Sequence, residues 1–168
     1  MFLNRGNHED TSCNLSNHFK PNFNADCNKK FNQYGGIVFK KSIELFTYLP
    51  IATIVSNKAG VKCFVVHGGV SDRVDLKTVS ASDLKRYEFE SVKVRPNDRG
   101  SEQFTDLLWS DPMTAQTKPH FKANGCFPSS RGAGYLFGED ISRNFCIKHG
   151  FSAIIRSHEV NLKLIFKF

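Results

Sequence analysis

The sequence predicts a mixed α/β (α+β) fold, and three observations support this prediction. Hydrophobic residues make up 40% of the 168 residues and charged residues 23%, which is ordinary globular composition. Short β-branched runs occur along the chain, and other segments repeat apolar residues at helical spacing. A chain of this length can bury one hydrophobic core but is small for two. We therefore expect one domain, or part of one.

The first third of the chain divides into two segments of different character. Residues 11–35 contain six asparagines as well as Pro21, and show neither helical nor strand periodicity. We expect an Asn-rich insertion or loop there. From Ile37 to Leu49, apolar residues recur at steps of three, four and seven, which predicts a helix that ends before Pro50.

The middle and the end of the chain predict strands and two shorter helices. Residues 51–55 and 62–66, IATIV and KCFVV, flank a turn-like segment and predict a β-hairpin. Ser80 and Asp83 resemble a capping box that begins a helix reaching about Phe89. In the final third, Asp140 is expected to cap a helix that stops at Gly150, and the FSAII run at 151–155 predicts another strand.

Composition argues against several classes of partner and compartment. No apolar run is long enough to span a bilayer, and the first residues lack the pattern of a signal peptide. The net charge is +7, but the basic residues are dispersed and do not interleave with aromatic residues as in a nucleic-acid-binding platform. Five widely spaced cysteines without a CxxC pair indicate reduced thiols. We expect an intracellular protein, cytoplasmic or also nuclear, with no nucleic-acid partner and no membrane span.

Three places in the sequence could carry chemistry. His67 directly follows one predicted strand and His158 lies just past the end of another, and side chains at strand ends in mixed α/β folds face the crevice where ligands bind. Asn7 and His8 lie together in a short polar loop. Taken alone, these residues are compatible with metal binding, with acid–base catalysis or with a purely structural role.

Five segments carry a family resemblance, and they occur in this order: RGNHED (5–10), VHGGVSD (66–72), LLWSDP (107–112), RGAGYLFG (131–138) and IIRSHE (154–159). They resemble the motifs of the phosphoprotein phosphatase family of Ser/Thr phosphatases. The resemblance is greatest to the EF-hand-bearing, retinal-degeneration-C type, with the tetratricopeptide-bearing phosphatases next. It implies a metallophosphoesterase (calcineurin-like) β-sandwich flanked by helices, of which this chain holds the second half.

The resemblance also implies an activity and a role for each site residue. Such enzymes hydrolyse phosphoserine and phosphothreonine with a hydroxide activated by two divalent metal ions, Mn or Fe and Zn. Asn7, His67 and His158 would bind the second metal. Arg131 would bind the substrate phosphate, and His8 would be the catalytic general acid.

Other residues are expected to be structural or peripheral. Gly68 and Gly69 are expected to allow a tight turn near the metals. Arg5 and the group Trp109, Asp111 and Pro112 are expected to act as structural anchors. Three histidines that match no motif are expected at the surface, namely His18, His120 and His149.

Two motifs of the phosphatase family, GDxHG and GDxVDRG, do not occur in the sequence. The resemblance implies that they supply the ligands of the first metal, which are therefore absent from this chain. After Val160 the sequence also departs from the family pattern. We expect residues 1–168 to be a partial catalytic domain, truncated at both ends and inactive alone. The alternative is a catalytically dead phosphatase-like binding module. Phosphoprotein substrates and regulatory domains or subunits are the expected partners.

Overall fold

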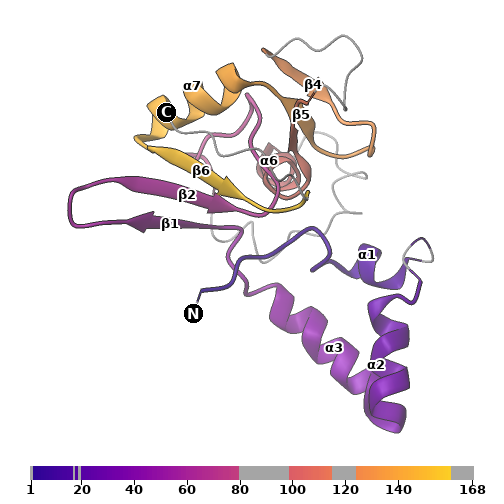
Figure 1. The fold of residues 1–168 in the computed structure, drawn as a ribbon. Coiled ribbons are helices and arrows are strands. Elements are labelled where there is room, and N and C mark those ends of the chain that lie inside the picture. Colours follow the sequence, from indigo (N-terminus) through magenta and orange to yellow (C-terminus); the bar gives the residue numbers. More distant parts are fainter. Residues whose placement is uncertain (1, 17, 19, 80–98, 115–123, 160–168) are drawn as a thin grey trace.

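The computed structural model describes residues 2–16, 18, 20–79, 99–114 and 124–159, and it contains two three-stranded sheets with helices around them (Figure 1). The mixed α and β class predicted from the sequence is confirmed. The helix predicted from Ser80 to Phe89 and the expected surface position of His120 lie outside the described residues. Within the described part of the chain, every helix is too short or too polar to cross a bilayer.

The first sheet contains the predicted hairpin. Its strands are β1 (Ala52–Ser56), β2 (Lys62–Val66) and β6 (Ala153–Arg156), in the order β1-β2-β6. β1 and β2 are antiparallel, with Ala52 opposite Val66, and this confirms the hairpin. β6 runs parallel to β2 and confirms the strand predicted near residues 151–155, although it begins at Ala153. Because β2 and β6 are parallel, the residues that follow them lie at the same edge of the sheet.

One face of this sheet is covered by α7 (Glu139–His149), as Figure 1 shows. The ring of Phe64 on β2 lies 5.1 Å from that of Phe145 on α7 and 5.3 Å from that of Phe151. Phe64 is only 1% exposed, and it lies in the main hydrophobic cluster. Burying an aromatic side chain in this way removes a large apolar area from water, so this contact stabilises the sheet that carries the strand ends.

The two ends of α7 differ in how well the sequence predicted them. Gly150 adopts a left-handed conformation with φ of 69°, and it stops the helix as expected. The expected N-cap is wrong, because Gly138 occupies the cap position without a side-chain hydrogen bond. Asp140 lies one residue inside the helix, and its carboxylate accepts a 2.8 Å hydrogen bond from the backbone N–H of Gly125. The aspartate therefore ties α7 to a distant loop.

The second sheet is small, and a buried helix precedes it. β3 (Asp111–Pro112), β4 (Cys126–Pro128) and β5 (Tyr135–Phe137) are arranged in the order β3-β5-β4. α6 (Arg99–Trp109) leads directly into β3 and buries Phe104, Leu107 and Leu108. The sequence analysis did not predict α6, although the spacing of three and four between these apolar residues is a helical signal.

The expected loop at residues 11–35 is wrong, because this segment is largely helical. It forms α1 (Thr11–Leu15), α2 (Phe23–Phe31) and a 3-10 turn η1 (Asn32–Tyr34), and α3 (Gly35–Phe46) follows. Polar side chains cap α1 and α2, and one of them, Asn22, is among the residues that indicated a loop. Asp10 accepts a hydrogen bond from the N–H of Ser12, and Asn22 accepts one from the N–H of Ala25. Whether the segment is an insertion stays a prediction.

The helix expected from Ile37 to Leu49 is confirmed as α3, which ends three residues earlier, at Phe46. Its apolar side packs on α2, because the ring of Phe23 lies 6.0 Å from that of Phe39 and 5.9 Å from that of Phe46. In Figure 1, α2 and α3 extend away from the two sheets. They therefore pack mainly on each other rather than on the core that holds the strand ends.

Candidate functional site

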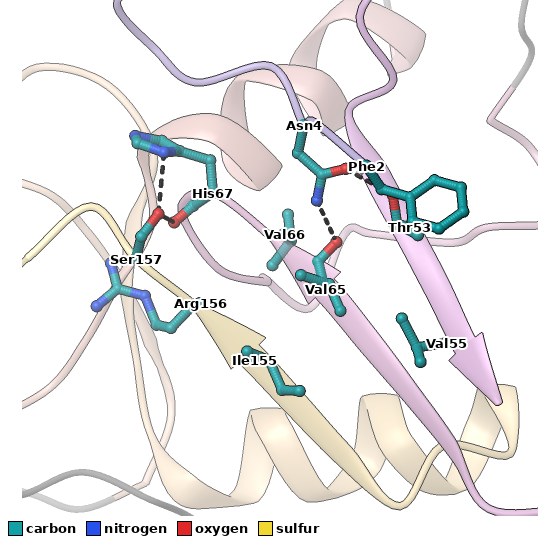
Figure 2. A pocket seen from close by; sticks show the side chains of 10 residues that line it. All are labelled: Phe2, Asn4, Thr53, Val55, Val65, Val66, His67, Ile155, Arg156 and Ser157. Atoms are coloured by element: carbon teal, nitrogen blue, oxygen red, sulfur yellow. Dashed lines mark hydrogen bonds between the residues drawn. The ribbon is translucent and has the colours of Figure 1, made fainter. Parts of the chain in front are cut away.

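The loop at residues 4–10 is fixed against the first sheet by hydrogen bonds to both strands of the hairpin. The side-chain N–H of Asn4 donates to the carbonyl of Val65 at 3.0 Å, and the hydroxyl of Thr53 donates to the Asn4 amide oxygen at 2.6 Å (Figure 2). The backbone N–H of Arg5 donates to the carbonyl of Pro50 at 2.8 Å. These contacts place Asn7, which is buried, beside the ends of β2 and β6.

The buried side chain of Arg5 holds the same loop together from within. Its Nε donates to the carbonyl of Glu9 at 2.9 Å, and its guanidinium lies 3.8 Å from the carboxylate of Asp10. The carboxylate of Glu9 in turn accepts from the N–H of Gly6 at 2.7 Å. A Cβ at Gly6 would lie 3.1 Å from the ring of His67, so a glycine permits the close approach between the loop and the histidine.

The structure brings Asn7, His67 and His158 together. The two imidazole rings lie 5.1 Å apart, centroid to centroid. The amide oxygen of Asn7 lies 2.9 Å from His67 Nε2, and its amide nitrogen lies 3.1 Å from His158 Nε2. The three side chains come from the loop at residues 4–10, the end of β2 and the end of β6. One amide group therefore contacts the Nε2 atoms of both rings.

Hydrogen bonds to the opposite ring nitrogens orient both histidines. His158 Nδ1 donates to the carboxylate of Asp111 at 2.8 Å, because a carboxylate can only accept. His67 Nδ1 lies 3.1 Å from the hydroxyl of Ser157, as Figure 2 shows. That hydroxyl can donate or accept, whereas the amide oxygen of Asn7 only accepts, so in this arrangement His67 carries its proton on Nε2 and its Nδ1 accepts from Ser157. This pattern, with Nδ1 bonded to the protein and Nε2 directed at a shared point, is the one found in metal-binding histidines.

The donor atoms fit a divalent transition metal. Amide oxygen and neutral imidazole nitrogen together suit manganese, iron or zinc. Among the described residues, no group of three His, Cys, Asp or Glu side chains is arranged to hold a metal, and the present group has two histidines and an amide instead. The set thus brings together three side chains whose donor atoms are of a kind that binds such metals.

His67 is neutral at physiological pH. Burial is the main cause that lowers its pKa to about 4, together with the charges of His158, Arg156 and His8 and against the opposing effect of Asp111. A neutral imidazole has a lone pair available for a metal, whereas an imidazolium has none.

Asp111 connects the histidine site to Arg131. The Nε of Arg131 lies 3.1 Å from Asp111 Oδ2, and its Nη2 lies 3.5 Å from the carboxylate of Glu159. Asp111 also accepts from Arg156 Nη2 at 2.6 Å. The expected structural role of Asp111 is compatible with its burial, and its contacts add a link between His158 and Arg131. Sequence reasoning missed its contacts because Arg156 and His158 lie 45 and 47 positions away.

The pKa of Asp111 is lowered despite its burial. Desolvation acts to raise it, but the hydrogen bond from His158 and the charges of His158, Arg156 and Arg131 outweigh that effect. The carboxylate is consequently ionised near neutral pH; its Oδ1 accepts hydrogen bonds from His158 and Arg156, and its Oδ2 forms an ion pair with Arg131.

Gly68 and Gly69 are needed for close packing next to His67. A Cβ at Gly68 would lie 2.5 Å from the backbone of Leu108 in α6, and one at Gly69 would lie 2.2 Å from the ring of Phe137 in β5. Neither glycine has a positive φ. Their role is therefore to let the chain after β2 approach both neighbours, rather than to form a turn that requires glycine.

The remaining histidines and Trp109 fall in different environments. Trp109 is partly buried against the core, and its ring faces that of His158 at 6.1 Å. His18 is exposed, as expected. The expected surface position of His149 is wrong, because its side chain is 5% exposed and its ring lies 4.8 Å from that of Phe145. The histidine follows the apolar face of α7 into the core.

Residues 1–162 match the calcineurin-like phosphoesterase family. The chain belongs to this family. The family and the fold predicted from the sequence are therefore confirmed. Calcineurin-like phosphoesterases use divalent metals, in agreement with the donor set at Asn7, His67 and His158.

Several relatives of this phosphoesterase are named Ser/Thr protein phosphatases. The chain is 37% identical over 164 residues to Serine/threonine-protein phosphatase T of Aspergillus oryzae, and the match covers 97% of the chain and 29% of that protein. It is 32% identical to Serine/threonine-protein phosphatase with EF-hands 1 of Rattus norvegicus, over 95% of the chain and 26% of the relative. It is 31% identical to Serine/threonine-protein phosphatase rdgC of Drosophila melanogaster, over 95% of the chain and 22% of that relative. The chain thus spans about a quarter of the length of these relatives.

Proposed function

We propose that this calcineurin-like phosphoesterase chain forms part of the active site of a metal-dependent protein-serine/threonine phosphatase. The observation that carries the proposal is the convergence of Asn7, His67 and His158, with Arg131 joined to the same group through Asp111. The names of the relatives support phosphoserine and phosphothreonine in proteins as the substrate class.

Three residues would hold one divalent metal, Mn, Fe or Zn. The ligands would be the amide oxygen of Asn7 and the Nε2 atoms of His67 and His158. A bound metal of this kind supplies Lewis acidity toward phosphate and toward water. The protein side of the site is prepared for it, because His67 is neutral and His158 directs its unprotonated Nε2 toward Asn7.

Two further residues would act directly on the substrate. Arg131 would hold the phosphoryl oxygens with its planar guanidinium, whose position is set by Asp111 and Glu159. His8, which is exposed and follows Asn7 in the sequence, would donate a proton to the leaving serine or threonine oxygen, because an imidazolium can act as a general acid. Both assignments follow from the family resemblance and are compatible with the positions of these side chains.

A second candidate function follows from the sequence. The GDxHG and GDxVDRG motifs, which the resemblance links to the first metal and to a bridging carboxylate, do not occur among the 168 residues. A chain with one set of metal ligands and a phosphate-binding arginine could bind phosphoproteins without hydrolysing them. Regulatory domains or subunits are further proposed partners, since one of the relatives is named for EF-hands.

An activity assay with two proteins separates these functions. The 168-residue chain is titrated with manganese and assayed on a phosphoserine peptide, alongside a fusion that adds a segment containing GDxHG and GDxVDRG. Metal-dependent hydrolysis by the fusion, and only background hydrolysis by the chain, is the expected result. A fusion that binds manganese and the peptide without turnover would favour the binding module.

The general acid is tested in the same fusion. His8→Ala should lower the rate on the order of 10² to 10⁴, and an aryl phosphate with a good leaving group should be affected less, because its leaving oxygen needs no proton. Equal losses on both substrates would argue against proton donation by His8.

We also propose that the protein acts inside the cell. Its five cysteines, all within the described residues, form no disulfide. Reduced cysteines are typical of the cytoplasm and the nucleus.

A further inference from the structure

Asp111 occupies a central position between the two halves of the proposed site. It is the first residue of β3, and its side chain is 1% exposed. Its Oδ1 accepts from His158 Nδ1 at 2.8 Å and from Arg156 Nη2 at 2.6 Å, and its Oδ2 lies 3.1 Å from Arg131 Nε. One buried carboxylate therefore contacts both His158, a proposed metal ligand, and Arg131, the residue proposed to bind phosphate.

The contact with His158 fixes which ring nitrogen carries the proton. Because the carboxylate accepts, Nδ1 is protonated and Nε2 keeps its lone pair, which faces Asn7. A hydrogen bond from Nδ1 to a carboxylate also makes a metal-binding imidazole more basic. His158 has a φ of 64°, so its backbone conformation is unusual and its ring orientation depends on such tertiary contacts.

The contact with Arg131 fixes the direction of the guanidinium. The side chain of Arg131 is 46% exposed, and an exposed arginine without a partner samples many rotamers. Asp111 holds its Nε edge, so the rest of the guanidinium is directed to one side. Arg156 places a second positive charge beside the buried carboxylate of Asp111, and it also pairs with Glu159. A buried carboxylate needs such partners to offset the loss of its hydration.

We propose that Asp111 is a positioning residue that sets the tautomer of His158 and the orientation of Arg131 together, and so couples metal binding to phosphate binding through one carboxylate. This inference rests on the proposed function for the roles of His158 and Arg131. The placement of Asp111 itself rests on the geometry alone.

The first test needs no metal. Long-range ¹H–¹⁵N correlation spectra of the histidine rings report which nitrogen of His158 is protonated, and the exchange rate of the Arg131 Nε–H reports its ion pair with Asp111. In the parent chain, His158 should be the Nδ1–H tautomer and the Arg131 Nε–H should exchange slowly. In Asp111→Asn, the Nδ1–H fraction should fall and the Arg131 Nε–H should exchange faster, because a neutral amide is a weaker acceptor than a carboxylate.

Asp106→Asn is the matched control. Asp106 is also fully buried and also binds an arginine through two nitrogens, Arg73 Nε at 3.1 Å and Nη2 at 2.8 Å. Its partners, Arg73 and Ser71, are not site residues. The control should destabilise the fold and leave the His158 and Arg131 signals unchanged. Changes of equal size in the two variants would show a general structural effect and overturn the proposal.

The second test measures metal affinity by calorimetry with zinc alone. Asp111→Asn should bind zinc on the order of 10 to 100 times more weakly than the parent, and Asp106→Asn should bind like the parent. Unchanged zinc affinity in Asp111→Asn overturns the positioning role. A parent chain whose His158 is protonated on Nε2 overturns it as well, and this measurement does not depend on whether a variant folds. A parent chain that binds no zinc would instead contradict the proposed function, and the spectra would still decide the role of Asp111.

Discussion

Asn7 Nδ2 lies 3.1 Å from His158 Nε2, although 151 positions separate the two residues in the sequence. The same amide reaches His67 Nε2 through its oxygen at 2.9 Å. A loop near the start of the chain and a strand end near its close therefore meet at one point. This relationship gives the site its first prediction.

Replacing Asn7 with alanine should weaken metal binding. Asn7→Ala removes the amide oxygen, one of three proposed ligands, so the affinity for manganese should fall at least tenfold, about the effect of losing an outer-shell partner. Calorimetric titration measures this. Asn28→Ala is the control, because Asn28 is an exposed residue on α2 whose side chain donates to the amide oxygen of Asn24, away from the proposed ligands. Equal affinities in the two variants would contradict the ligand assignment.

Arg131 should recognise phosphate through its planar fork. In the manganese-loaded chain, Arg131→Ala should weaken inorganic phosphate binding about 10- to 100-fold, the range expected for a hydrogen bond to a charged group. Arg131→Lys should not restore it, because lysine is a point charge without the two-pronged geometry. Arg143→Ala, which removes an exposed arginine paired with Glu139 on α7, serves as the control. Full recovery in the lysine variant would show that only charge matters.

The stability of the core under the first sheet should depend on the side chain of Phe64. Phe64→Ala should lower the free energy of unfolding by about 3–5 kcal/mol, because it leaves a cavity between β2 and α7. Phe2→Ala removes the same side chain from a position that is 88% exposed, and should have little effect. Urea unfolding followed by circular dichroism measures both. Similar losses in the two variants would mean that the packing of β2 on α7 contributes little.

His149 should make the protein less stable in acid. Burial lowers its pKa, and the charges of Lys148 and Lys77 add to this effect against that of Asp75. The unfolded chain therefore binds more protons than the native chain below about pH 6.5, so the free energy of unfolding falls as the pH drops through that value.

His149→Gln tests this pH dependence. The variant should lose less stability than the parent between pH 7.5 and pH 5.5 in urea unfolding, because it has no imidazole to protonate. Part of the acid sensitivity should remain, since the pKa of His67 is lowered in the same direction. An identical pH profile in the parent and the variant would rule out a contribution from His149.

The sequence predicted the elements whose signals are local. The hairpin of β1 and β2, the strand β6 and the stop of α7 at Gly150 each depend on residues within a few positions of one another. The loop expected at residues 11–35 failed for a local reason as well. Asparagine and aspartate favour both turns and helix N-caps, and Asp10 and Asn22 are caps here.

By itself, the sequence determined the family, the strand ends that carry His67 and His158, and the motif residues Asn7, His8 and Arg131, because these depend on short sequence motifs and on the order of those motifs along the chain. Only the tertiary structure decided that Asn7 bridges both histidine rings and that Asp111 links His158 to Arg131. The physical reason is that these contacts depend on the parallel register of β2 and β6 and on the packing of β3 beside them. Residues distant in sequence meet only when the strands are aligned, and no local pattern records that alignment.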